Sequence, residues 1–472
     1  MTMRYRHLIL LGSIAACLVQ APVSFSDGTT PALSSVSITQ SPSIHKALSG
    51  FPDDTGTRTS DLDFDEEALA VLRKKFLKSE QAIKRRDRNR YHTYRAGLET
   101  YPLYPYLEYQ WLRRHPGDND GIAAFLEEHG SSRYAWPLRK KWLNTLASKK
   151  RWTEFLDAWR PTSDVRLQCY HALARFETGD RRSALIDASQ LWSAGRSQPG
   201  SCDPLFARLM KSDHFTTALV WKRFVAALDN NNARLARYIS KKLPASDKEI
   251  ADRWYALHRN PERHLADLIE SEPSPQDADM FQHAIHRMSR DDPYQAIEMW
   301  DRYHDHFLLS DDQVGKTERR LAMKLVFEND SAAYNRLASL NSHTSSSREW
   351  QIRTALRDQN WSAVSASIME LDEATRQTER WQYWLARAYY ETGKPVQADE
   401  IFGQLASRRD YYGYLAAEQL EQDYQLADTP LEVSDAQVRA VSSREAFRAA
   451  FELMALDRER EAKLQWWHAL KS

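Results

Sequence analysis

Histidines occur in two close pairs whose residue type suits metal binding: His283 with His286, and His304 with His306. Zinc proteases place their ligands in an HExxH helix, and structural zinc sites use cysteines at short spacing. Neither pattern accompanies these histidines. The chain also lacks a GxSxG nucleophile elbow and a GxxxxGK[ST] phosphate loop. We therefore predict no metal site, no cofactor and no catalytic residue of these kinds.

The N-terminal residues have the order of an export signal. A basic segment precedes a short apolar run, and small residues end at Ser26. The run is too short to span a membrane. We predict a Sec-type signal peptide at 1–26, no transmembrane segment and a periplasmic location. In the alternative, the sequence Ile14 to Cys17 is a lipobox and Cys17 carries a lipid.

The remaining two cysteines predict a disulfide. Removal of the signal peptide leaves only Cys169 and Cys202, in a compartment that oxidises thiols. Two cysteines allow one intramolecular pairing. In the loop-entropy model, closing this separation restricts the unfolded chain by roughly 3 to 4 kcal/mol.

The candidate residues named above must be positioned by helices, because the chain shows the pattern of paired amphipathic helices. Residues 381–406 repeat the i, i+3, i+4, i+7 spacing of a buried helical face twice, with Gly393 and Pro395 between the two halves. Glycine suits the end of a helix and proline the start of the next. This pair matches a tetratricopeptide-type hairpin, with Ala386 and Ala398 at the close approach. A related pattern at residues 172–191 predicts further hairpins, because one pair cannot bury its own apolar face.

Composition supports an all-α chain. Glycine makes up only 15 of 472 residues, and no long alternation of β-branched residues occurs. Lys plus Arg and Asp plus Glu number 65 each, so no overall field favours nucleic acid. Residues 27–62 are rich in Ser, Thr, Pro, Asp and Gly without periodicity, which is typical of a disordered leader. Residues 73–95 carry ten basic side chains, which would either solvate a helix face or attract an anionic polymer.

Three segments resemble landmarks of the soluble lytic murein transglycosylases. They are YPLYPYLEY at 101–109, SQPGSCDPLF at 197–206 and YYGYLAAEQL at 411–420. The two prolines of the first should hold Tyr101 and Tyr104 extended before a helix that runs on from Pro105. The resemblance implies a ring-like or curved superhelix of short helical hairpins, then a helical linker domain, then a lysozyme-like catalytic domain.

The family's catalytic domain carries a Glu-Ser pair, and its glutamate cleaves the MurNAc–GlcNAc bond with formation of 1,6-anhydro products. The only Glu-Ser here, Glu270-Ser271, lies beside two prolines in a predicted loop. We therefore expect the catalytic domain to be missing from this chain, and whether the chain is an enzyme stays open. The expected ranges are 63–408 for the superhelical domain and 409–472 for a truncated linker domain.

The resemblance implies peptidoglycan glycan strands as the partner, with other cell-wall proteins as further candidates and no nucleic acid. Tyr411, Tyr412 and Tyr414 crowd three aromatic rings into four positions, so they cannot all face one core and are candidate glycan contacts. We predict a non-catalytic, peptidoglycan-positioning scaffold. The alternative is a free-standing helical-repeat adaptor that binds a protein partner.

Overall fold

The computed structural model describes residues 66–270, 274–426, 430 and 432–471. Every regular element in these ranges is a helix, which confirms the predicted all-α class. Across the same ranges, no helix combines the length and the apolar character needed to cross a membrane. The predicted signal peptide at 1–26, the leader at 27–62 and Cys17 lie outside the described residues.

The described chain divides into a larger and a smaller compact unit. The larger unit runs to residue 332 and takes up the chain again after residue 426. Its helices are α3 (Glu66–Arg85), α4 (Arg88–Arg95), α5 (Tyr104–Leu112), α6 (Asn119–Glu128), α7 (Ala135–Ser148), α8 (Trp152–Ala158), α9 (Val165–Glu177), α10 (Arg181–Trp192), η2 (Gly200–Cys202), α11 (Asp203–Leu209), α12 (Thr217–Asp229), α13 (Ala233–Ser240), α14 (Ala245–Arg259), α15 (Pro261–Glu270), α16 (Pro275–Asp291), α17 (Pro293–Tyr303), η3 (His304–His306), α18 (Asp311–Phe327), α26 (Asp435–Ser442), α27 (Glu445–Ala455) and α28 (Glu459–Ala469).

The smaller unit covers most of residues 333–426. Its helices are α19 (Ala333–Ala338), α20 (Ser345–Arg357), α21 (Trp361–Met369), α22 (Glu373–Arg376), α23 (Glu379–Glu391), α24 (Pro395–Ala406) and α25 (Tyr411–Gln419). Helix α25 packs against α24, whereas the three helices after it belong to the larger unit. The domain ranges 63–408 and 409–472 stay a proposal.

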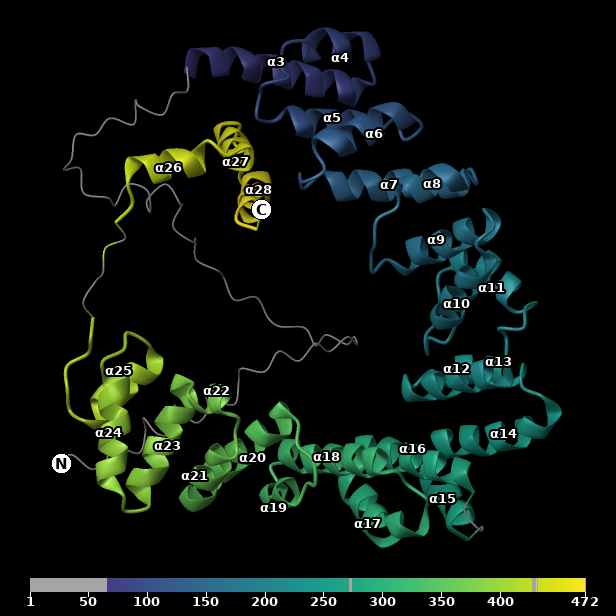
Figure 1. The fold of residues 1–472 in the computed structure, drawn as a ribbon, viewed down its shortest axis with the longest axis vertical. Coiled ribbons are helices and arrows are strands. Elements are labelled where there is room, and N and C mark those ends of the chain that lie inside the picture. The colour runs from purple at the N-terminus through teal and green to yellow at the C-terminus, as the bar shows by residue number, and fades with distance from the viewer. Residues whose placement is uncertain (1–65, 271–273, 427–429, 431, 472) are drawn as a thin grey trace, which may run out of the picture. The chain divides into compact units, whose positions relative to one another are not determined.

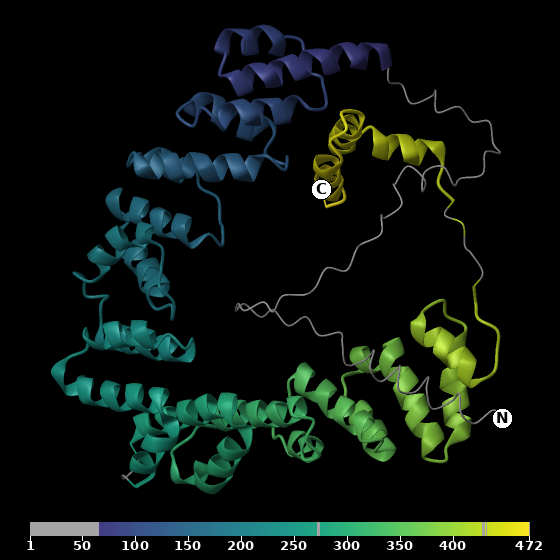
Figure 2. The same ribbon diagram turned by 180° about the vertical axis from the view of Figure 1, so that it is seen from behind.

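Successive helices pack as hairpins within each unit. In the larger unit, α9 pairs with α10, α12 with α13 and α16 with α17. Figures 1 and 2 show these pairs stacked one after another along the chain. Each pair leaves an apolar face that the next pair covers, which is why hairpins occur in series.

Small residues set the distance between the two helices of a hairpin. Ala386 of α23 and Ala398 of α24 are fully buried, as predicted for their close approach. Gly393 has φ +77°, the left-handed conformation that ends α23, and Pro395 is the first residue of α24. The same design recurs in α9 and α10, where Ala172 and Ala184 are buried. The predicted hairpins are therefore confirmed.

The expectation for Tyr104 was wrong. Tyr104 begins α5 and Pro105 follows it within the first turn, whereas the sequence suggested an extended Tyr104. A proline early in a helix loses no hydrogen bond, because the first amides have no intrahelical acceptor. Helix formation here outweighs the mild preference of a pre-proline residue for extended geometry.

Two arginine–glutamate pairs fasten the C-terminal helices to the N-terminal ones. Arg73 of α3 donates to both carboxylate oxygens of Glu452 on α27, at 2.9 and 2.7 Å. Arg458, just before α28, donates to both oxygens of Glu80 on α3, at 2.9 and 2.6 Å. We call these four residues the clasp. Both glutamates are buried, and bidentate pairs of this kind are strong and directional.

The tyrosines of the first landmark complete the clasp. The Tyr101 hydroxyl donates to Glu452 at 2.7 Å, and the Tyr106 hydroxyl donates to Glu80 at 3.2 Å. Burial by itself would raise the pKa of Glu80, but the hydrogen bond and charge of Arg458 outweigh it and lower that pKa. Burial, with the charge of Glu80, raises the pKa of Tyr106 to about 12. The landmark thus holds together segments more than 350 residues apart.

The basic segment 73–95 uses much of its charge internally. Arg73 bonds Glu452, Lys84 bonds Glu80, and Arg95 bonds Glu108. Lys75 donates to the carbonyl of Ala96. These side chains are bound within the protein and do not simply solvate a helix face. Attraction of an anionic polymer by the segment stays a prediction.

Candidate functional site

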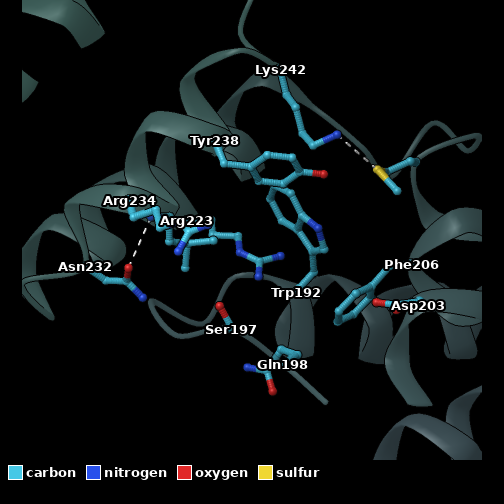
Figure 3. Close-up of a pocket in the computed structure, with 12 residues that line it drawn as sticks. Trp192, Ser197, Gln198, Asp203, Phe206, Arg223, Asn232, Arg234, Tyr238 and Lys242 are labelled. Atoms are coloured by element: carbon cyan, nitrogen blue, oxygen red, sulfur yellow. Dashed lines mark hydrogen bonds between the residues drawn. The ribbon is translucent and has the colours of Figure 1, made fainter. Parts of the chain in front are cut away.

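A pocket of about 640 Å³ opens in the larger unit beside the second landmark. Its walls come from the end of α10, the loop that follows, α11, α12, α13 and the turn after α13 (Figure 3). The lining residues are Trp192, Ser197, Gln198, Asp203, Phe206, Met210, Arg223, Asn232, Arg234, Leu235, Tyr238 and Lys242.

A disulfide holds one wall of the pocket. Cys169 of α9 is bonded to Cys202 in the short turn η2, with the two Cα atoms 5.0 Å apart. The predicted pairing is therefore confirmed. Because Cys202 lies directly before α11 and shortly after Ser197 and Gln198, the bond fixes the loop that presents both side chains.

Glycine brings the same loop against α12. A Cβ atom at Gly195 would lie 2.0 Å from the carbonyl oxygen of Ala226 and 2.4 Å from the side chain of Asn230. The first of these is backbone and cannot move aside, so only glycine permits this approach. Ala226 is one turn after Arg223 on α12. The close contact therefore sets the loop beside Arg223.

Arg223 is the central charge of the pocket. It sits on the buried stripe of α12, between Val220 and Phe224, and is only 6% exposed. Its guanidinium lies 4.6 Å from the ring centre of Trp192 and 5.9 Å from that of Phe206. Figure 3 shows it pointing into the pocket between Trp192 and Ser197.

No acceptor within the described residues satisfies Arg223. Its Nε is buried without a hydrogen-bond partner, and no carboxylate of that part of the chain lies within ion-pair distance of the group. Burial lowers the pKa of the guanidinium. An arginine starts so far above neutral that it nevertheless stays protonated. The pocket therefore holds a permanent, uncompensated positive charge.

The rest of the lining adds to this positive charge. Arg234 and Lys242 are basic, and Asp203 is the only acidic side chain among the lining residues. The Lys242 ammonium lies 5.1 Å from the ring centre of Tyr238 and 3.6 Å from the Met210 sulfur, so its contacts are with neutral groups. Asp203 is exposed and is not a buried acid of the kind that protonates a glycosidic oxygen. The arrangement is suited to binding an anion.

The third landmark places its tyrosines on different neighbours. Tyr411 is 51% exposed and meets Tyr412 edge-on, with 5.1 Å between the ring centres. Tyr412 also packs 5.7 Å from Tyr383. Tyr414 packs 5.4 Å from Tyr424. The three rings therefore do not form one platform, and their glycan contact stays a prediction.

His283 and His286 are engaged with protein groups. His283 contacts His258 at 3.0 Å through one ring nitrogen and Asp229 at 3.1 Å through the other. His286 contacts the Thr317 hydroxyl at 3.0 Å. Burial lowers the pKa of both His258 and His286 to about 4.

In the other histidine pair, His304 contacts the carbonyl of Trp300 at 3.0 Å and His306 is exposed. Throughout the described ranges, no three His, Cys, Asp or Glu side chains converge as metal ligands would.

Sequence reasoning missed Arg223, Trp192 and Tyr238. One signal was present: in α12, the buried positions Val220, Phe224 and Ala227 follow helical spacing, and Arg223 falls among them. A charged residue on an apolar stripe is the informative observation, because exposed charges are ordinary.

A family model described as cucumovirus coat protein matches residues 182–259. This match covers 78 of the 472 residues, all between α10 and α14. It is too local to describe the chain.

Wider similarity is to proteins of one kind. The soluble lytic murein transglycosylase of Escherichia coli K12 is 25% identical over 415 residues, which is 86% of this chain and 64% of that protein. The chain thus spans under two thirds of the length of this curated relative.

Two solved structures agree with this similarity. The lytic transglycosylase Slt of Pseudomonas aeruginosa, solved as an inactive mutant, superimposes with TM-score 0.75 and 26% identity, covering 84% of this chain and 66% of that one. The 70-kDa soluble lytic transglycosylase of E. coli gives TM-score 0.69 and 25% identity, covering 86% and 66%. In sequence and in fold, the chain is similar to the soluble lytic murein transglycosylases.

Proposed function

We propose that this chain is the non-catalytic, superhelical portion of a periplasmic soluble lytic murein transglycosylase and that it positions peptidoglycan glycan strands. The similarity over 86% of the chain is the observation that supports this function. The reaction served would be the non-hydrolytic cleavage of the MurNAc–GlcNAc bond to 1,6-anhydro products.

Two physical features support a positioning role. Stacked hairpins provide an extended surface, which suits a polymer better than a small ligand. The pocket at Arg223 carries positive charge, whereas the peptides of the wall polymer carry carboxylates. Binding of this kind requires no catalytic residue.

The test is co-sedimentation. Purified protein is incubated with isolated sacculi, the sacculi are pelleted, and bound protein is measured, with the supernatant analysed for 1,6-anhydromuropeptides by mass spectrometry. We expect protein in the pellet and no anhydro products above a no-protein control. Anhydro products would disprove the non-catalytic role, and protein left in the supernatant would disprove the positioning role.

The protein-binding adaptor is a second candidate because of one surface. Helices α27 and α28 leave Phe451, Trp466 and Trp467 exposed, and Phe451 and Trp466 lie 6.3 Å apart. Other exposed apolar side chains on or directly after α26, α27 and α28 are Val438, Val441, Met454, Leu464 and Leu470. Exposed aromatic rings that contact one another, as those of Phe451 and Trp466 do, are typical of protein interfaces. Absence of both pelleting and products would make this function the leading one.

A further inference from the structure

A buried positive charge is normally removed in one of two ways. It pairs with an anion, or the group gives up its proton. His258 takes the second course, because its pKa is lowered to about 4 and it is neutral at pH 7. Arginine cannot do so. Arg223 therefore stays charged, and the described protein supplies no anion for it.

Aromatic contacts offset only part of this cost. The Arg223 guanidinium lies 4.6 Å from the ring centre of Trp192 and 5.9 Å from that of Phe206, and these contacts are favourable but form no hydrogen bond. The N–H donors of the guanidinium have no acceptor among the described residues. These donors form a planar fork that fits the two oxygens of a carboxylate.

The pocket is large enough to hold a small molecule rather than a single ion. Its volume of about 640 Å³ falls in the range of small-molecule sites. Tyr238 is 56% exposed and Met210 is also exposed, so both offer apolar surface to the part of a ligand that carries the anion. Ser197, Gln198 and Asn232 add neutral groups that can bond amides. The C-terminal end of a peptide has all three features: a carboxylate, apolar side-chain surface and backbone amides.

We propose that this pocket binds a carboxylate of a short peptide, with the Arg223 guanidinium as its partner and Tyr238 beside the adjoining backbone or side chain. Resting on the proposed function, the peptide is a stem peptide of peptidoglycan. The guanidinium fork also fits phosphate. The apolar surface and the amide-bonding groups of the lining are what favour a peptide carboxylate.

The experiment is isothermal titration of the full chain with muramyl dipeptide, which carries one free carboxylate, and with its carboxamide. We expect the acid to bind at least about tenfold more tightly than the amide, since a hydrogen-bonded charge pair is lost in the latter. Inorganic phosphate should compete weakly. Equal binding of acid and amide, or stronger binding of phosphate, would overturn the proposal.

Variants locate the binding. Arg223→Met should weaken muramyl dipeptide at least about tenfold, and Arg223→Lys should give an intermediate loss because it keeps the charge without the fork. Arg237→Met is the matched control, because Arg237 lies on α13 outside the lining and pairs with Asp252. Circular dichroism checks the fold of each variant. An unchanged affinity in both Arg223 variants would refute the site.

The sacculus assay separates the two proposals. If muramyl dipeptide binds through Arg223 but sacculi do not pellet the protein, the carboxylate site stands and the positioning role fails. If sacculi pellet wild type and Arg223→Met equally and the dipeptide does not bind, the positioning role stands and this site fails.

Discussion

Two arginines of the described chain are almost fully buried, and they lie in opposite electrostatic settings. In the smaller unit, Arg387 bonds Glu391 at 2.8 Å and Gln419 at 2.5 Å, with Trp361 5.9 Å from its guanidinium. In the larger unit, Arg223 also stacks on a tryptophan but has no such partners. The two arginines are almost equally buried and each lies beside a tryptophan. They differ in that only Arg387 has a carboxylate partner.

The comparison separates structural charges from charges available for binding. Arg387 joins α23 to α25, and the clasp arginines join distant helices. The hydrogen bonds of these arginines are therefore made within the protein and are not available to a ligand. Arg223 contacts aromatic rings but forms no ion pair with the described chain. A fold retains an uncompensated buried charge at a cost, which is reasonable where a ligand supplies the missing partner.

The largest expected effect comes from turning a paired arginine into an unpaired one. Glu452→Ala removes the acceptor of both Arg73 and Tyr101, and breaking a buried pair in this way costs about 3 to 5 kcal/mol. Thermal unfolding should show a lower midpoint, and limited proteolysis should cut near α27 and α28. Glu459→Ala is the matched control, because the Glu459–Lys463 pair is exposed to solvent and contributes little to stability. Equal midpoints for the two variants would contradict the clasp.

Acid should destabilise the fold, because the buried His258 is neutral in the folded protein and must take up a proton at low pH. The pKa of His258 is lowered to about 4 by burial, then by His283 and by the nearby Arg287, Arg290 and Arg259. The unfolded chain, with a pKa near 6.5, binds more protons between these values. Stability is therefore complete above about pH 6.5 and falls by up to about 3 kcal/mol as the pH drops to 4, at roughly 1.4 kcal/mol per pKa unit.

Unfolding midpoints measured from pH 7 to pH 4 test this dependence. His258→Gln should make the slope shallower and leave the contribution of His286, whose pKa is also lowered to about 4. His306→Gln, at an exposed position, should leave the slope unchanged. The clasp should respond at lower pH than an ordinary glutamate pair would, because burial of Glu80 is outweighed by Arg458, which lowers the pKa of that carboxylate. A slope that is the same in His258→Gln and wild type would assign the acid response to other groups.

The smallest effect on stability is expected where the charge is unpaired. Arg223→Met removes an uncompensated buried charge and also a cation–π contact, so the two changes nearly cancel and unfolding should shift by less than about 1 kcal/mol. Arg387→Met should cost about 2 kcal/mol, because Glu391 and Gln419 lose their partner. If both variants are equally destabilised, Arg223 has a structural role and the comparison fails.

Local sequence patterns determined the helical class and the hairpins. Helical periodicity, the alanines at close approach and the Gly393–Pro395 punctuation all act within one or two turns of chain, so they can be read directly. The disulfide could be predicted because only two cysteines remained to pair. The landmarks located the important segments, but they did not say what each tyrosine contacts.

Only the tertiary structure decided which charges are paired. Arg73 and Arg223 each stand in an amphipathic helix, and their neighbours in sequence do not show that one meets Glu452 while the other meets no carboxylate of the described chain. That outcome depends on helices hundreds of residues apart and on how closely Gly195 lets a loop approach α12. Electrostatic energy follows distance and burial in space, so the sequence determined where the charges lie along the chain and the fold determined what each one does.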